Sequence, residues 1–213
     1  MHLKSRADKI RKILRKIYPE VQTQLYHNNP FQLLVATILS AQCTDKQVNQ
    51  VTQVLFNHMK TPEKFASAPL KTIERLIRPT GFFHNKAKNI KNCSQALLQK
   101  HEGEVPRTLE ELVKLPGVGR KTANVVLGAA FGIPGVVVDT HVARISNRLG
   151  LTSNKNPVKI EFDLMNIIPR QAWNEFCLQL IYFGRSTCMA RKPKCPQCPL
   201  EKLCPWPDKT TQL

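Results

Sequence analysis

The sequence predicts an all-α protein, because helix signals recur along all 213 residues while strand signals are nearly absent. Capping residues and prolines divide the chain into segments whose apolar positions repeat every three to four residues, the spacing of one helix face. The valine-rich stretch at 135–138 has strand propensity, but it is short and has no partner strand. We therefore expect it to be a buried extended connector. A chain of this length can bury a sizeable core in one large or two small domains.

The first third of the chain contains three predicted helices. The N-terminal segment has the pattern of a basic amphipathic helix, with apolar residues on one side at Leu3, Ile10, Ile13, Leu14 and Ile17. It lacks the apolar core of a secretion signal, and its pattern continues into the body of the protein, which disfavours a mitochondrial presequence. Asn29 and Pro30 open the apolar segment 31–41, which we expect to be a buried central helix. Thr44 can cap the next helix, whose repeated positions are Val48, Val51, Val54, Leu55 and His58.

Shorter helices are predicted towards the middle of the chain. Pro62 and Pro69 mark the starts of two of them, and the second ends before Pro79. A further helix is predicted over 87–98 from an apolar stripe made by Ala87, Ile90, Cys93 and Leu97. The basic residues beside this stripe are expected to face solvent or phosphate: Lys86, Lys88 and Lys91.

The segment Leu115–Ala123 reads Leu-Pro-Gly-Val-Gly-Arg-Lys-Thr-Ala. A Thr-x-x-Glu capping box at Thr108 begins a short helix over about 109–114, which Pro116 and Gly117 stop. Gly119 is expected to free the backbone for a tight turn, and a second helix begins near Arg120. This is a helix–hairpin–helix, whose exposed backbone N–H groups beside a helix N-terminus can bind a phosphate.

Lys121 lies in the first turn of the second hairpin helix, where the helix dipole disfavours a positive charge. It is therefore a candidate amine nucleophile. A lysine that contacts a DNA phosphate explains its position equally well. Further along, Asp139 or Thr140 can cap a helix that ends at Gly150. Two more helices are predicted, one beginning at Asn156 and one over 171–183 with Trp173, Phe176, Leu180 and Phe183 facing inward.

Four of the seven cysteines lie close together at the C-terminus, in the pattern C-x6-C-x2-C-x5-C formed by Cys188, Cys195, Cys198 and Cys204. Thiolates this close must share a metal centre. Structural zinc sites favour two short cysteine pairs, whereas this array has one, so the spacing favours iron–sulfur and leaves zinc as the alternative. A basic loop lies between the first two ligands, with Arg191, Lys192 and Lys194. The remaining cysteines, in apolar helical settings, are expected to be core residues: Cys43, Cys93 and Cys177.

The composition points to a polyanionic partner. The chain has 32 Lys and Arg against 15 Asp and Glu, a formal charge of +17, and nucleic acid is the first candidate. A merely basic protein with no such partner is the alternative. No apolar run approaches the ~20 residues of a membrane span. The odd cysteine count argues against a disulfide framework, so we expect a cytoplasmic protein.

Together, the hairpin with Lys121, the Val-Asp-Thr-His at 138–141 and the cysteine spacing resemble the endonuclease III family over essentially the whole chain. These are helix–hairpin–helix DNA glycosylases with a [4Fe–4S] cluster. The resemblance implies two helical domains beside a DNA-binding cleft. One is a helical barrel over 22–134 that contains the helix–hairpin–helix at about 107–131. The other is an iron–sulfur cluster domain made of 1–21 and 135–213.

The resemblance also implies an activity. The enzyme would be a bifunctional glycosylase and abasic-site lyase that removes oxidised or ring-damaged pyrimidines from double-stranded DNA. In this family Lys121 would attack C1′ and form a Schiff base, after which β-elimination cuts the strand 3′ to the lesion. Asp139 would be the catalytic carboxylate, although an ordinary N-cap explains it too. The four C-terminal cysteines would hold the [4Fe–4S] cluster.

Further DNA contacts follow from the same resemblance. Gln42 matches a glutamine that enters the base stack when the damaged base is flipped out. The family usually has a second wedge residue, the leucine of a Gly-Leu-Tyr motif. In this sequence the corresponding residues are Gly81-Phe82-Phe83. Phe82 therefore either takes the position of the wedge leucine or is a core aromatic. His141 is expected to help fix the helix start near the cleft. The remaining expected DNA contacts are Gly117, Gly119, Arg120, Arg191, Lys192 and Lys194.

Three other functions compete with this one. An adenine glycosylase of the same fold generally lacks the hairpin lysine and has an extra C-terminal domain. A non-catalytic DNA-binding iron–sulfur protein would not need both Lys121 and Asp139. A ferredoxin-type electron carrier would be small and acidic. We expect a monomer that works in the cytoplasm at the bacterial nucleoid.

Overall fold

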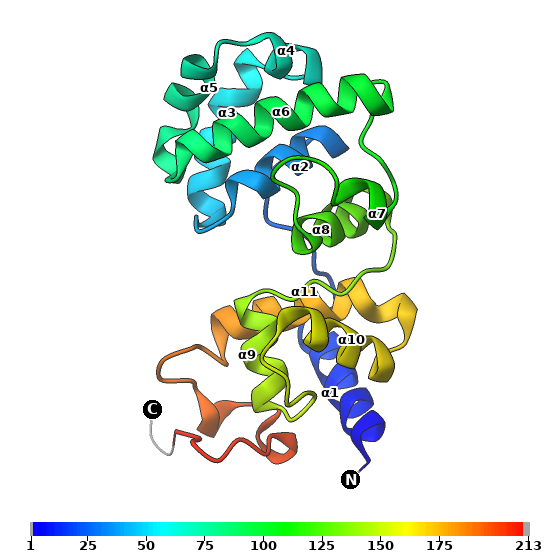
Figure 1. Ribbon diagram of the computed structural model, residues 1–213. Coiled ribbons are helices and arrows are strands. Elements are labelled where there is room, and N and C mark those ends of the chain that lie inside the picture. Colours follow the sequence, from blue (N-terminus) through cyan, green and yellow to red (C-terminus); the bar gives the residue numbers. More distant parts are fainter. Residues whose placement is uncertain (1, 211–213) are drawn as a thin grey trace. The chain divides into compact units, whose positions relative to one another are not determined.

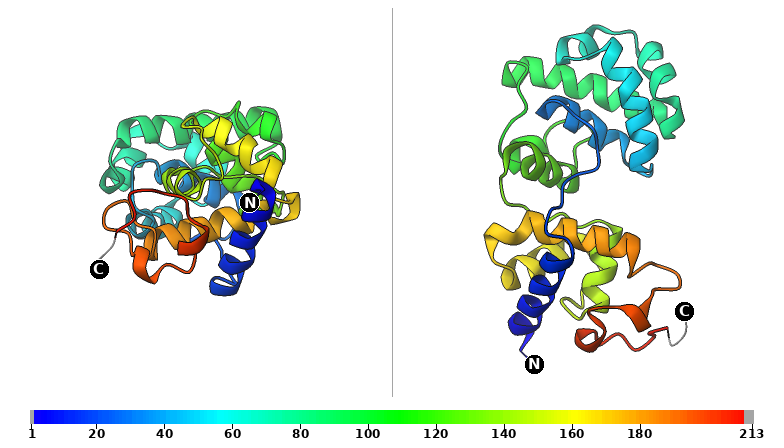
Figure 2. Two further views of the ribbon diagram at one scale, coloured as in Figure 1. Left: turned by 90° about the horizontal axis from the view of Figure 1, so that it is seen from below. Right: turned by 180° about the vertical axis from the view of Figure 1, so that it is seen from behind.

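The computed structural model describes residues 2–210 of the chain, and this part consists of helices and loops without a β-strand. It confirms the all-α prediction. The chain divides into two compact units (Figure 1). The central unit is Thr23–Ile133, and the discontinuous unit joins the residues up to Gln22 with those from Pro134 onward. Figure 2 gives two further views of the same helices.

The central unit contains seven α-helices and one 3₁₀ turn among its described residues. In chain order they are α2 (Pro30–Leu39), α3 (Asp45–His58), α4 (Pro62–Ser67), α5 (Leu70–Ile77), η1 (Arg78–Thr80), α6 (Phe83–His101), α7 (Leu109–Leu112) and α8 (Arg120–Phe131). The α2 helix is the centre of this unit and packs against α3, α6 and α8. As predicted, every residue of α2 from Phe31 to Leu39 is buried.

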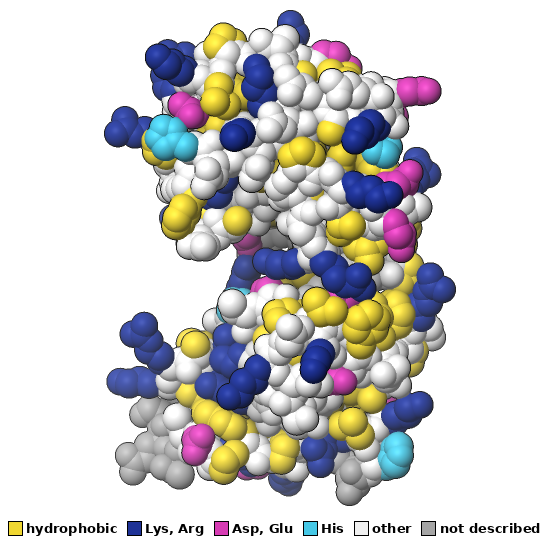
Figure 3. Space-filling model, in the orientation of Figure 1, with side chains coloured by type: hydrophobic (Ala, Val, Ile, Leu, Met, Phe, Trp, Pro, Cys, Tyr) yellow, Lys and Arg dark blue, Asp and Glu magenta, His cyan; other side chains and the backbone are white. Residues whose placement is uncertain are grey.

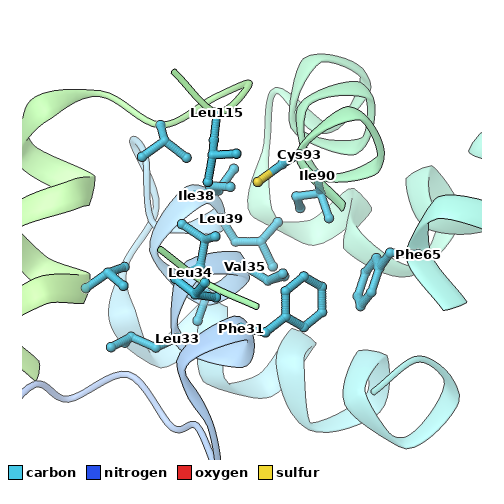
Figure 4. Close-up of a cluster of buried hydrophobic side chains, with 14 of the residues drawn as sticks. Phe31, Leu33, Leu34, Val35, Ile38, Leu39, Phe65, Ile90, Cys93 and Leu115 are labelled. Atoms are coloured by element: carbon cyan, nitrogen blue, oxygen red, sulfur yellow. The ribbon is translucent and has the colours of Figure 1, made fainter. Parts of the chain in front are cut away.

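Two features of the sequence place α2 in the core. The side chain of Asn29 accepts a hydrogen bond from the Gln32 N–H, and Pro30 occupies the first turn, so the helix start is satisfied locally. The apolar side chains then fill the core around α2 (Figure 4). There the rings of Phe31 and Phe65 meet edge to face, with their centroids 5.6 Å apart. Each fully buried leucine of this core contributes about 2 kcal/mol.

The discontinuous unit is built around α11. Its elements are α1 (Leu3–Ile17), α9 (Thr140–Arg148), α10 (Pro157–Ile167), η2 (Arg170–Ala172), α11 (Trp173–Ser186), η3 (Cys195–Gln197) and η4 (Glu201–Leu203). The α11 helix packs against both α1 and α9, which joins the N-terminal helix to the C-terminal part of the chain. The stretch at 135–138 is not a strand, and Val136 and Val138 are buried, as the sequence predicted.

Several side chains differ from the sequence predictions. Val54 was expected on the apolar face of α3 but is 50% exposed. Leu3 and Ile17 lie at the two ends of α1, where no neighbouring helix covers them fully, and both are exposed. Lys86 was expected to face solvent or phosphate but is 5% exposed, because it turns into the core of the central unit. None of the helices in residues 2–210 is long and apolar enough to cross a membrane.

Candidate nucleic-acid interface and metal centre

The structure contains the predicted hairpin between α7 and α8, with α7 ending at Leu112. The Thr108 hydroxyl accepts a hydrogen bond from the Glu111 N–H at 3.3 Å and donates one to the Glu111 carboxylate at 2.6 Å. The chain turns after α7, where the Val118 N–H donates to the Leu115 carbonyl at 3.1 Å. Gly119 is the N-cap of α8 and has no side chain that could cap it. No side chain of the N-cap residue therefore covers the N-terminus of α8.

The two hairpin glycines have different roles, and the expectation for Gly119 was wrong. Gly117 has the left-handed backbone, with φ 77°, whereas Gly119 is extended, with φ −87° and ψ 171°. A Cβ added at Gly117 would lie 2.7 Å from the Cβ of Asn89. A Cβ added at Gly119 would meet nothing within 4 Å. The turn therefore requires glycine at position 117, and the missing side chain of Gly119 leaves open space before the helix end.

Replacing each glycine by alanine should separate these roles. We expect Gly117→Ala to lower the free energy of unfolding by about 1–3 kcal/mol, because it combines a strained φ with a collision against Asn89. Gly119→Ala should lower it by less than about 1 kcal/mol, since alanine is only a somewhat poorer N-cap. Urea denaturation of both variants measures the difference. Equal losses would contradict the assignment of the turn to Gly117.

Lys121 and Asp139, the two residues predicted to be catalytic, lie in different units. Lys121 is exposed in the first turn of α8, in the central unit. Asp139 is the N-cap of α9, in the discontinuous unit, and its Oδ1 accepts a hydrogen bond from the Val142 N–H at 2.8 Å. Asp139 is half-buried. The N-cap interpretation of Asp139 is thus confirmed, and the cap uses one of the two carboxylate oxygens.

His141 holds the first turn of α9 against α11. Its Nδ1 lies 3.3 Å from a guanidinium nitrogen of Arg144. A Cβ on Gly184 of α11 would lie 2.7 Å from the same Nδ1, so only glycine allows this close packing. Burial lowers the pKa of His141, with Asp139 opposing the shift and Arg144 and Arg185 adding to it. The neutral ring is the form that this packing favours.

The two predicted wedge residues share an unusual backbone conformation. Gln42 follows α2 with φ 53°, and Phe82 precedes α6 with φ 48°. Both side chains are exposed, and Phe82 is 64% exposed, so the core interpretation of Phe82 is wrong. Left-handed residues other than glycine are uncommon and collect at functional sites. The central unit thus presents a polar and an aromatic side chain on two strained turns.

The four C-terminal cysteines are free and line one pocket. Cys188 follows α11, Cys195 and Cys198 flank the η3 turn, and Cys204 follows η4. Burial raises the pKa of Cys198 to about 11 and also raises that of Cys204. No three His, Cys, Asp or Glu side chains in residues 2–210 are grouped to hold a single metal ion. Four thiols on one pocket are nevertheless the donor set of an iron–sulfur cluster, and its binding would release their protons.

Two arginines of α9 contact Cys188 at this pocket, and the sequence analysis missed them. The Nη1 of Arg148 donates to the Cys188 Sγ at 3.4 Å and to the Met189 carbonyl at 2.7 Å. Its guanidinium lies 3.9 Å from the ring centroid of Trp206. Arg144 donates to the Cys188 carbonyl at 2.9 Å. In the sequence, these two arginines lie five and nine residues after Asp139, the N-cap of α9. That spacing is the one sequence feature that connects them with the N-cap.

The basic loop between the first two cysteines is exposed. All three of its cations reach solvent: Arg191, Lys192 and Lys194. Lys192 has a left-handed backbone, with φ 48°, and the Lys194 N–H donates to the Thr187 carbonyl at 3.0 Å, which closes the loop. On the face in Figure 3, Lys and Arg side chains far outnumber Asp and Glu. This is the charge distribution expected for contact with a polyanion.

Two family models match the chain. The HhH-GPD superfamily of base excision DNA repair proteins matches residues 35–170. The iron–sulfur binding domain of endonuclease III matches residues 188–204, the segment from the first to the last cysteine of the array.

Individual proteins match over nearly the full length. Endonuclease III of Synechocystis sp. is 53% identical over 203 residues, which cover 95% of this chain and 93% of that protein. A solved non-covalent complex of endonuclease III with DNA is 46% identical, with a TM-score of 0.93 and 96% coverage of both chains. A trapped covalent endonuclease III–DNA intermediate is equally similar, with 96% of this chain and 97% of that one covered.

Proposed function

This chain belongs to the endonuclease III family of helix–hairpin–helix base excision DNA repair proteins, and we propose that Lys121 and Asp139 are its catalytic residues. It is a DNA-binding enzyme, a DNA glycosylase and abasic-site lyase with a [4Fe–4S] cluster. The observation that supports Lys121 is its place: an exposed amine in the first turn of α8, next to the open backbone of Gly119.

The Lys121 amine attacks C1′ of the damaged nucleotide, and the bond from C1′ to the base breaks. The amine loses a proton and the sugar ring opens, so that the positive charge lies on an iminium. That charge acidifies the C2′ proton, whose removal expels the 3′ phosphate and cuts the strand. An alcohol nucleophile could not supply this last step. Asp139 stabilises the positive charge that develops at the sugar and takes part in the proton transfers.

The other expected site residues have supporting roles. The hairpin backbone binds one phosphate of the DNA through Gly117, Gly119 and Arg120. Gln42 and Phe82 fill the gap left by the flipped nucleotide. His141 positions the start of α9, and with it Asp139, through its packing on Gly184.

The four cysteines Cys188, Cys195, Cys198 and Cys204 hold the cluster. When bound, a [4Fe–4S] cluster supplies four iron–thiolate bonds and a redox-active centre. Cys188, two residues after α11, and Cys195, just after the basic loop at 189–194, would then fix both ends of that loop. The enzyme works as a monomer in the cytoplasm, at the nucleoid. Its substrates are oxidised or ring-damaged pyrimidines.

Borohydride trapping tests the activity and the mechanism together. The duplexes contain either one abasic site or one thymine glycol, and borohydride reduces an imine to a stable protein–DNA adduct. We expect an adduct with both, because the abasic duplex reports imine formation and the thymine glycol duplex adds base removal. Tight binding without any adduct would leave a hydrolytic glycosylase or a passive damage binder and would overturn the proposal.

The basic loop should contribute to the salt dependence of DNA binding. Replacing Arg191, Lys192 and Lys194 by glutamine should lower the slope of log K against log salt by about 2–3, one counterion for each lost phosphate contact. The matched control removes three exposed lysines of the central unit, Lys64, Lys71 and Lys100, and should leave the slope nearly unchanged. A triple loop variant with the slope of the intact protein would show that the loop does not contact phosphate.

A further inference from the structure

Lys86 is a buried cation that joins two helix ends. It lies in the first turn of α6, and its Nζ donates to the Leu39 carbonyl and to the Thr80 carbonyl, both at 2.8 Å. Leu39 is the last residue of α2 and Thr80 the last residue of η1. Carbonyls at helix C-termini lack partners within the helix and carry the negative end of the dipole. One ammonium group thus donates to a terminal carbonyl of both elements.

Both helix ends lead directly into the strained turns. Gln42 lies three residues after Leu39, and Phe82 two residues after Thr80. The Lys86 backbone N–H also donates to the Phe82 carbonyl, at 3.1 Å. Burial lowers the pKa of Lys86, and the nearby thiol of Cys43, the residue after Gln42, opposes that shift. Lys86 therefore contacts or adjoins the backbone of both turns at once.

We propose that Lys86 is a positioning residue that holds the Gln42 turn and the Phe82 turn in one fixed arrangement, so that both side chains enter the DNA together. This inference rests on the proposed function of Gln42 and Phe82. Two separate exposed turns would each lose conformational freedom when they insert into DNA. Two turns whose preceding helix ends are bound to the same ammonium group have lost part of that freedom already.

The burial of this lysine is difficult to explain by stability alone. Removing an ammonium group from water is costly, and the partners of Lys86 are neutral carbonyls rather than a carboxylate. The left-handed backbones of Gln42 and Phe82 are strained conformations. The surroundings must hold both turns for these conformations to persist, and Lys86 is the side chain that reaches both.

The test compares base removal with imine formation in the Lys86→Met variant. Single-turnover release of thymine glycol should fall by about 10–100-fold, because the misplaced side chains no longer support the flipped base. The yield of borohydride adduct on an abasic duplex, which has no base to displace, should stay within about threefold of that of the intact protein. This yield also measures the fraction of enzyme that is folded and active. Lys100→Met removes the same charge from the other, exposed end of α6 and should leave both reactions unchanged.

A double-mutant cycle separates positioning from a general structural effect. In the background Gln42→Ala/Phe82→Ala, Lys86→Met should change base release by less than about threefold, because there are no side chains left to position. The same fold-loss in both backgrounds would overturn the inference, as would a Lys86→Met variant as fast as the intact protein. If Lys86→Met does not fold, Lys86→Gln, which keeps an N–H donor, takes its place in the cycle.

This design also distinguishes failure of the inference from failure of the proposed function. An intact protein that forms no adduct with abasic DNA contradicts the proposed function. An active intact protein whose Gln42→Ala/Phe82→Ala variant retains full base release contradicts the wedge roles. When the intact protein forms the adduct and the Gln42→Ala/Phe82→Ala variant loses base release, the Lys86→Met result tests the role of Lys86. Either result of that comparison then supports or overturns the inference.

Discussion

Lys121→Gln is expected to abolish strand cleavage and borohydride-dependent adduct formation while binding to damaged duplex persists. Glutamine keeps a hydrogen-bonding side chain of similar length but has no nucleophilic amine, so no imine can form. The loss should be at least about 10³-fold, the scale seen when a nucleophile is removed from other enzymes. DNA binding depends on the hairpin backbone and on other cations. The loss of affinity should therefore not exceed the contribution of one phosphate contact.

Lys114→Gln is the matched control for this substitution. Lys114 is an exposed lysine of the same hairpin segment, just after α7, and its loss changes the net charge by the same amount. We expect strand cleavage within about threefold of the intact protein, since a single surface charge affects mainly the association rate. Cleavage by Lys121→Gln at the rate of the control would assign the nucleophile to another residue.

Asp139→Asn should lower the rate of base removal by about 10²–10³-fold without unfolding α9. Asparagine is as good an N-cap as aspartate, so its side-chain oxygen can still accept from the Val142 N–H. The neutral amide cannot stabilise positive charge at the sugar. The free energy of unfolding should fall by less than about 1 kcal/mol, the value of one charge at a helix N-terminus. Single-turnover kinetics and urea denaturation measure the two effects.

Asp139→Ala completes the comparison because it removes the cap as well as the charge. It should lose the same catalytic rate as Asp139→Asn and in addition about 1 kcal/mol of stability. The two variants thus distinguish the cap, which the structure contains, from the carboxylate chemistry that we propose. An Asp139→Asn variant with the rate of the intact protein would reduce Asp139 to its capping role.

Helix starts marked by a capping side chain were the most predictable part of this protein, whereas α6, predicted from Ala87, begins at Phe83. Asn29, Thr44, Thr108, Asp139 and Asn156 were each assigned as caps or helix starts, and each side chain accepts a hydrogen bond from a backbone N–H of its own helix. Such bonds span two or three residues, so the sequence nearby contains all the information. The same holds for the cysteine array, whose spacing alone favoured iron–sulfur over zinc, in agreement with the family match at 188–204.

The errors occurred where a residue's environment comes from a distant segment. The tight turn was assigned to Gly119, whereas Gly117 makes it. The sequence near the hairpin does not reveal that Asn89 of α6 leaves no room for a Cβ at Gly117. Phe82 could be core or surface until its left-handed backbone and 64% exposure were known. Lys86 was expected to be exposed because lysine normally is.

The sequence by itself therefore determined the all-α class, the helix starts, the hairpin and the metal-binding array. All of these depend on interactions between residues close in the chain, or on spacing that a motif preserves. Only the tertiary structure decided which glycine the turn requires, which arginines approach the cysteines, and that Lys86 lies inside. Those outcomes depend on carbonyls and side chains far away in sequence, 47 residues away in the bond from Lys86 to Leu39. A local sequence pattern cannot indicate a hydrogen-bond partner that comes within reach only when distant segments pack together.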